Sequence, residues 1–127
     1  MTGDEQLNEN GLNRGFRLGD WTVRPGSGVL ESHDGPVHLE PKQMDLLVFL
    51  AHRAPEVASK EEIFGAVWPG SYVAEVGLKR NVSQLRRALG DDARHPRIIK
   101  TIPKRGYQLL IPVVPIDASQ DEAAADD

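Results

Sequence analysis

Cationic side chains are concentrated between residues 76 and 112, where nine Lys and Arg stand against two Asp, a local charge of +7. The whole chain of 127 residues has a formal net charge of −4, and acidic residues recur in 1–13 and after residue 112. Phosphate groups are common ligands of such a cationic segment, so the chemistry open to these residues is nucleic-acid binding. The inference of nucleic-acid binding depends on how the charge is distributed along the chain, because the net charge of the whole chain alone argues against it.

The cationic segment begins with a predicted amphipathic helix over about residues 76–89, with Gly90 as its left-handed cap. Its apolar stripe recurs at i, i+4, i+7 and i+11 and consists of Leu78, Val82, Leu85 and Leu89. At about 100° per residue, the opposite face holds Arg80, Ser83, Gln84 and Arg87. The flanks hold Lys79, Arg86 and Asn81.

The polar face of this helix could read DNA bases. Arg can donate two hydrogen bonds to guanine and Gln can pair with adenine, so Arg80 and Gln84 are the candidates for base contacts. The alternative is an ordinary solvated helix face. Such a face usually mixes charges of both signs, whereas no acid occurs from Val76 to Gly90. DNA contact is therefore the preferred interpretation.

A basic β-hairpin is predicted directly after this helix. Residues 98–102 are rich in apolar and β-branched side chains and predict a strand. Residues 103–106 have the composition of a turn, and residues 107–109 predict the second, returning strand of the hairpin. Lys104 and Arg105 lie at the predicted tip, and Gly106 permits close approach. A soluble turn would also carry charges, but paired cations at a hairpin tip favour a grip on a DNA backbone.

The preceding residues predict the scaffold that positions these two elements. Short apolar segments separated by Gly and Pro between residues 16 and 39 predict four short strands. Helical periodicity begins at Pro41, and Ser59 with Glu62 forms a capping box for a second helix. We therefore expect an α+β fold, a winged helix-turn-helix with a four-stranded antiparallel N-terminal sheet, three helices and a C-terminal hairpin wing.

Other classes of function find little support in the residues. The chain has no Cys, and its four His are scattered without metal-ligand spacing, so we expect no catalytic residue, metal or cofactor. The N-terminus lacks the pattern of a signal peptide, and no apolar stretch approaches the roughly 20 residues of a membrane span. A cytoplasmic protein without membrane contact by this segment is expected.

Four motifs in order resemble the effector domain of OmpR/PhoB-type regulators, with the CadC/ToxR-like branch as the nearest likeness. They are LEPKQMDLL at 39–47, VWPG at 67–70, VSQLRRALGDD at 82–92 and TIPKRGY at 101–107. The resemblance covers roughly residues 16–112. It implies a bacterial transcription regulator that binds double-stranded promoter DNA, with helix 76–89 in the major groove and wing 101–109 on the adjacent backbone or minor groove.

The resemblance also implies roles for individual positions. Positions 80 and 84 fall where the family contacts bases, and phosphates are expected at Asn81, Ser83, Arg86 and Thr101. The wing contributes Lys104, Arg105 and Tyr107. Simpler interpretations remain, because Asn81 and Ser83 could face only water and Thr101 could be a β-branched strand residue. Trp68 is more often core than contact, although its indole N–H could reach a phosphate, and the Tyr107 ring is expected to pack inside with its hydroxyl exposed.

We expect the winged-helix domain to span 15–113, between disordered tails at 1–14 and 114–127, of which the second is acidic or begins a linker. Tandem or dimeric occupancy of repeated half-sites is expected, and RNA polymerase is a further candidate partner. CadC/ToxR-like proteins place this domain first, before a linker and a membrane span, so the chain could be the cytoplasmic part of an anchored regulator. The alternatives are a winged helix that binds proteins without reading DNA and, more distantly, an RNA-binding module.

Overall fold

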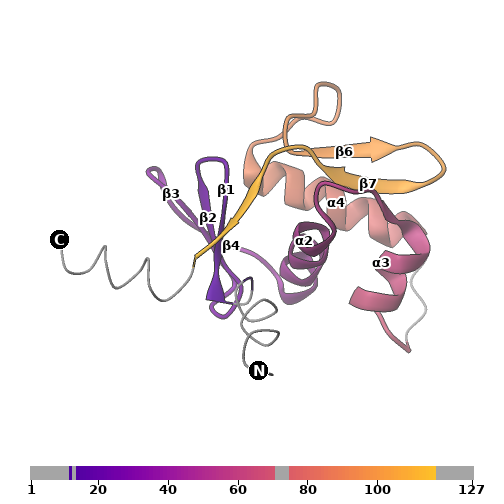
Figure 1. The fold of residues 1–127 in the computed structure, drawn as a ribbon, viewed down its shortest axis with the longest axis horizontal. Coiled ribbons are helices and arrows are strands. Elements are labelled where there is room, and N and C mark those ends of the chain that lie inside the picture. The colour runs from indigo at the N-terminus through magenta and orange to yellow at the C-terminus, as the bar shows by residue number, and fades with distance from the viewer. Residues whose placement is uncertain (1–11, 13, 71–74, 117–127) are drawn as a thin grey trace, which may run out of the picture.

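The computed structural model describes residues 12, 14–70 and 75–116, which form two antiparallel sheets and three helices (Figure 1). The four N-terminal strands are β1 (Phe16–Leu18), β2 (Trp21–Arg24), β3 (Val29–Ser32) and β4 (Gly35–His38). The helices are α2 (Pro41–Arg53), α3 (Lys60–Val67) and α4 (Glu75–Leu89). The remaining strands are β5 (Ala58–Ser59), β6 (Ile99–Ile102), β7 (Gly106–Leu109) and β8 (Val113–Pro115). The α+β class, the three helices and the C-terminal hairpin are as predicted.

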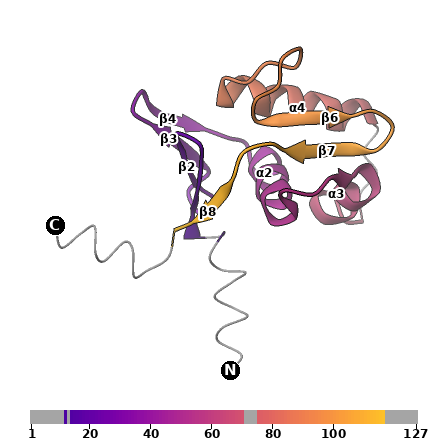
Figure 2. The ribbon, with the colours of Figure 1, turned by 45° about the horizontal axis from the view of Figure 1, so that its top comes forward.

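The N-terminal sheet has five strands, so the prediction of four was wrong. Its order is β4-β3-β2-β1-β8, and β8 pairs antiparallel with β1, with Phe16 opposite Pro115. Figure 2 shows β8 running from the hairpin down to this sheet. Pro112 and Pro115 hid the strand in the sequence, but an edge strand tolerates proline because one of its sides needs no ladder hydrogen bonds.

The ends of the folded unit also differ from the predicted limits of 15 and 113. Leu12, inside the stretch predicted as a tail, is only 7% exposed and belongs to the core. At the other end Ile116 donates its backbone N–H to the Gly15 carbonyl at 3.0 Å. The remainder of both predicted tails lies outside the described residues.

Both predicted helix starts are confirmed. The Gln43 side chain accepts the backbone N–H of Glu40 at 3.1 Å, and Ser59 and Glu62 exchange two bonds of 3.0 Å. These contacts satisfy N–H groups that a helix leaves without partners in its first turn. Helix α2 is at the centre of the core, between the N-terminal sheet and the other two helices (Figure 1).

The second sheet carries the hairpin and has the order β5-β7-β6. Gly106 pairs with Ser59 in β5 and with Ile102 in β6. A Cβ atom at Gly106 would lie 1.8 Å from the Ala58 carbonyl oxygen. The close approach predicted for this glycine is therefore to a neighbouring strand rather than to an outside ligand. No helix among the described residues is long and apolar enough to cross a membrane.

Candidate nucleic-acid interface

Helix α4 buries one face and leaves the other open. Leu78, Val82, Leu85 and Leu89 are buried, as the stripe predicted, whereas Lys79, Arg80, Ser83 and Arg87 are exposed. Among the described residues, no carboxylate lies within 4.0 Å of the Lys79, Arg80 or Arg87 side chains. This open face is therefore cationic and not neutralised by contact ion pairs.

The helix begins at Glu75, one residue before the predicted start, and so includes an acid in its first turn. The Lys60 ammonium donates a hydrogen bond to the Glu75 carboxylate. This bond and the Lys60 charge lower the pKa of Glu75. Because α3 thereby neutralises the one acid of α4, the open face keeps its positive character.

Arg86 is buried rather than placed on the open face, with 9% of its surface exposed. Its Nε and Nη2 donate to the Ile99 carbonyl oxygen at 3.2 and 3.0 Å, and Nη2 donates to Thr101 Oγ1 at 2.7 Å. Two of the four predicted phosphate contacts, Arg86 and Thr101, thus lie together and join α4 to β6. The exposed Thr101 hydroxyl keeps its own proton to donate, whereas the Arg86 guanidinium is directed into the protein.

The two amide side chains of α4 are also engaged within the protein. Gln43 Nε2 of α2 donates to Gln84 Oε1 at 2.5 Å, while Asn81 Nδ2 donates to the Gly77 carbonyl at 2.9 Å. A bidentate contact to adenine needs both the oxygen and the nitrogen of a Gln amide. As the structure stands, Gln84 offers only its Nε2 donors outward.

The hairpin tip holds its cations on a tight turn. Arg105 donates its backbone N–H to the Ile102 carbonyl at 3.0 Å, and Lys104 has a φ of 65°. Pro103 followed by a residue of positive φ is the pattern of a type II turn, in which glycine usually takes the second position. The exposed Lys104 and Arg105 side chains therefore project from a turn whose base is tied to α3 by a 3.0 Å bond from the Lys60 N–H to the Arg105 carbonyl.

Tyr107 and Trp68 lie mainly inside the domain. Tyr107 is 3% exposed, and burial raises the pKa of its hydroxyl. Trp68 is half-buried against the core, with its ring centroid 6.2 Å from that of Phe64. Both are therefore better placed to support the surface than to form it.

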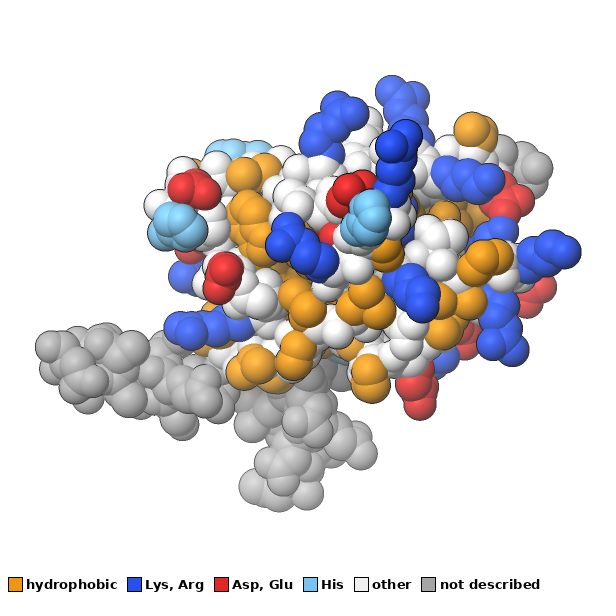
Figure 3. Space-filling view, turned by 90° about the horizontal axis from the view of Figure 1, so that it is seen from above, with side chains coloured by type: hydrophobic (Ala, Val, Ile, Leu, Met, Phe, Trp, Pro, Cys, Tyr) orange, Lys and Arg blue, Asp and Glu red, His pale blue; other side chains and the backbone are white. Residues whose placement is uncertain are grey.

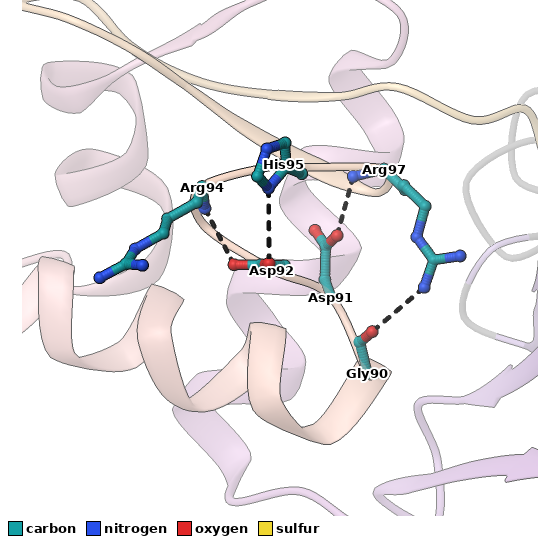
Figure 4. A network of polar contacts seen from close by, with 6 residues as sticks. All are labelled: Gly90, Asp91, Asp92, Arg94, His95 and Arg97. Atoms are coloured by element: carbon teal, nitrogen blue, oxygen red, sulfur yellow. Dashed lines mark hydrogen bonds and ion pairs between the residues drawn. The ribbon is translucent and has the colours of Figure 1, made fainter.

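A cationic loop follows α4 where the sequence predicted only a turn (Figure 4). Asp91 accepts the backbone N–H groups of Arg97, Ile98 and Ile99 at 2.8, 3.2 and 2.8 Å. Asp92 accepts that of Arg94 at 3.0 Å. Both acids thus fix the loop. The Arg97 guanidinium donates from Nη2 to the Gly90 carbonyl at 3.5 Å, whereas the Arg94 guanidinium points away on the other side of the loop (Figure 4).

The hairpin side of the molecule gathers these cations on one face. Figure 3 shows Lys and Arg side chains projecting around its upper and right margins. The exposed cations of the hairpin and the loop before it are Arg94, Arg97, Lys100, Lys104 and Arg105. Among the described residues, no group of three or more His, Asp or Glu is arranged to hold a metal ion.

Comparison with known proteins identifies several similar chains. The family model described as "Transcriptional regulatory protein, C terminal" matches residues 34–109. The transcriptional activator CadC of Escherichia coli is 39% identical over 99 residues, which are 77% of this chain and 19% of that protein. The cholera toxin transcriptional activator of Vibrio cholerae is 35% identical over 114 residues, 84% of this chain and 39% of that protein. The chain thus spans well under half the length of these relatives.

Solved structures show the same arrangement of elements. The DNA-binding domain of Escherichia coli CadC superimposes with a TM-score of 0.73 at 37% identity, over 80% of this chain and 96% of that one. The Klebsiella pneumoniae RstA DNA-binding domain, solved in complex with its RstA box, has a TM-score of 0.67 at 24% identity, over 76% of this chain and 96% of that one. The second likeness concerns the fold alone.

Proposed function

This chain belongs to the family of C-terminal domains of transcriptional regulatory proteins, and on that premise we propose that its winged-helix domain binds duplex DNA sequence-specifically in a bacterial transcription regulator. In this proposal α4 enters the major groove and the β6–β7 hairpin lies on the adjacent backbone or minor groove. The observation that carries it is the open face of α4, whose cations have no contact ion pairs among the described residues.

The exposed residues divide into base readers and phosphate contacts. Arg80 is at the centre of the open face and can donate two hydrogen bonds to guanine, whereas Gln84 can add a donor from its Nε2. The exposed cationic and hydroxyl side chains around them would contact phosphates. These side chains are Lys79, Ser83, Arg87, Thr101, Lys104 and Arg105. Asn81 could join them if its bond to Gly77 opens.

Buried members of the predicted set support this surface from below. Arg86 positions β6 against α4 through the Ile99 carbonyl, Tyr107 belongs to the core, and the half-buried Trp68 packs against that core. We propose no direct DNA contact for these three side chains.

Assembly and location follow from the same proposal. The matched region is a minor part of each relative, so the chain would supply the DNA-binding part of a larger regulator. Tandem or dimeric occupancy of repeated half-sites would raise its affinity, and RNA polymerase would be a further partner. We further propose that this part acts in the cytoplasm, where promoter DNA lies, either free or as the N-terminal part of an anchored protein.

Selection from a random duplex library, followed by titration of the selected duplex and a scrambled duplex at two salt concentrations, tests the proposal. We expect the selected duplex to bind more tightly than the scrambled one, and both to weaken as salt rises. Arg80→Ala should relax sequence preference, whereas Arg105→Ala should weaken both duplexes alike. Arg17→Ala, which removes an exposed charge from the N-terminal sheet, is the matched control and should change neither. Equal and salt-insensitive binding of the two duplexes would favour a protein-binding module instead.

A further inference from the structure

Val76 is the most exposed large hydrophobic residue of the described chain, with 72% of its surface accessible in the first turn of α4. The other exposed large hydrophobics, Leu110 and Val114, lie on or beside the β7 and β8 strands. Single exposed apolar residues are common on protein surfaces, so exposure alone assigns no role. The position of Val76 on the helix is more informative.

Val76 is on the cationic face of α4. At about 100° per residue, Arg80, Ser83 and Arg87 all lie within roughly 40° of Val76 around the helix axis. The buried stripe that begins at Leu78 is on the opposite side, so the valine does not contribute to the core. An apolar group thus occurs within a surface that is otherwise polar.

An isopropyl group on this surface can recognise one feature of DNA. Valine has no side-chain hydrogen-bond donor or acceptor, and among the four bases only thymine presents a methyl group in the major groove. The N-terminal residues of a recognition helix are the ones that contact base edges. The geometry points to Val76 as a specificity residue that contacts a thymine C5-methyl group, an inference that rests on the proposed function.

The position of that thymine follows from the helix rise. Val76 and Arg80 are one helical turn apart, about 6 Å along the axis. Base pairs are stacked roughly 3.4 Å apart, so the thymine should lie on the order of two base-pair steps from the guanine that Arg80 contacts. The contact therefore predicts a specific position in the DNA site as well as a base.

Replacing thymine by deoxyuridine tests the contact, because this change removes the methyl group and nothing else. Each thymine of the duplex selected in the library experiment is replaced in turn, and the dissociation constant is measured for the chain of 127 residues. At one position near the guanine that Arg80 contacts, the affinity should fall about fourfold. This factor corresponds to the free energy of burying one methyl-sized group. Val76→Ala should bind the thymine and deoxyuridine duplexes equally at that position, whereas Val76→Ile should keep the difference.

Val114→Ala is the matched control, since it removes the same methyl groups from an exposed valine in β8 and should leave the thymine preference intact. An undiminished difference between thymine and deoxyuridine in Val76→Ala would overturn the inference, as would a wild-type chain that is insensitive to every replacement. A selection that yields no preferred duplex would instead overturn the proposed function, so the two failures are distinguishable. A Val76→Ala variant that binds DNA as before but no longer associates with another protein would reassign this valine to a protein interface.

Discussion

The Trp21 indole donates its Nε1–H to the carbonyl oxygen of Leu89 at 3.1 Å, so strand β2 holds the last turn of α4 across 68 residues of sequence. Carbonyls in the last turn of a helix have no partner within the helix. This bond satisfies one of them and joins the N-terminal sheet to the helix that we propose reads DNA. The sheet is thereby a support for the interface rather than a separate appendage.

Trp21→Phe should lower the free energy of unfolding by about 1 kcal/mol, because it removes this hydrogen bond while keeping most of the packed ring. For a domain of this size, the midpoint of thermal unfolding should fall by roughly 4–8 °C. Trp68→Phe is the control, since the described residues include no hydrogen-bond acceptor for the Trp68 indole, and it should cost less. Equal losses in the two variants would mean that ring packing, not the bond to Leu89, is the important contact.

Arg86 and Arg87 are adjacent cations with opposite surroundings, and methionine substitutions should separate their roles. Arg86→Met removes the buried donors of the Ile99 carbonyl and Thr101, so it should lower stability by about 1–3 kcal/mol. The slope of log affinity against log salt should hardly change, since a buried guanidinium is directed away from phosphate. Arg87→Met should leave stability within roughly 0.5 kcal/mol and reduce the magnitude of that salt slope by about 0.9.

Thermal unfolding and DNA titration of both variants check this pair. A reduced salt slope for Arg86→Met without loss of stability would show that its side chain leaves the interior to bind phosphate. The phosphate role given to position 86 by the family resemblance would then be correct.

The contrast between these arginines illustrates which features the sequence could predict. Local features could be predicted, because the stripe of α4 follows from the helical period and the Ser59–Glu62 capping box joins two residues three positions apart. The cationic character of the open face also follows from spacing alone. Each of these features depends on residues within one or a few turns of each other.

Features that depend on partners distant in the sequence could not be predicted from it. A helical wheel placed Gln84 and Arg86 near the open face, but their partners are Gln43, 41 residues upstream, and Ile99, 13 residues downstream. The strand β8 was missed both because its prolines hid it and because its partner β1 lies at the opposite end of the domain in sequence. Tertiary contacts therefore decided which polar residues of the predicted site face outward.

Asp91→Asn should destabilise the domain near neutral pH, and its effect should fade in acid. Burial opposes ionisation of Asp91, but backbone N–H groups, chiefly those of Arg97 and Ile99, outweigh burial and lower its pKa. A lowered pKa in the folded state means that ionised Asp91 contributes its full stability above the unfolded value of about 3.9. That contribution is lost as the pH falls from about 4 through the folded-state pKa.

The difference in melting temperature between wild type and Asp91→Asn should accordingly be greatest near pH 7 and shrink below pH of about 4. Asp92→Asn is the control, because this carboxylate is exposed and accepts one N–H, from Arg94, and it should have a smaller effect at neutral pH. A constant difference across the pH range would show that the Asp91 charge does not contribute.

Lys104 combines a charge with a strained backbone, and two substitutions should separate them. Both Lys104→Ala and Lys104→Gly remove a cation from the hairpin tip, so each should weaken binding to all duplexes alike and reduce the magnitude of the salt slope by about 0.9.

The stabilities of the two Lys104 variants should differ. The φ of 65° destabilises an alanine variant by on the order of 1 kcal/mol, whereas glycine adopts this φ without strain. Part of the advantage of glycine is offset, because it increases the conformational entropy of the unfolded chain. Lys104→Gly should therefore unfold at a higher denaturant concentration than Lys104→Ala, by about 0.5 kcal/mol in free energy, while the two bind DNA equally. A glycine variant that binds DNA more weakly than the alanine variant would show instead that the rigidity of the turn, and not only its charge, contributes to the grip of the wing.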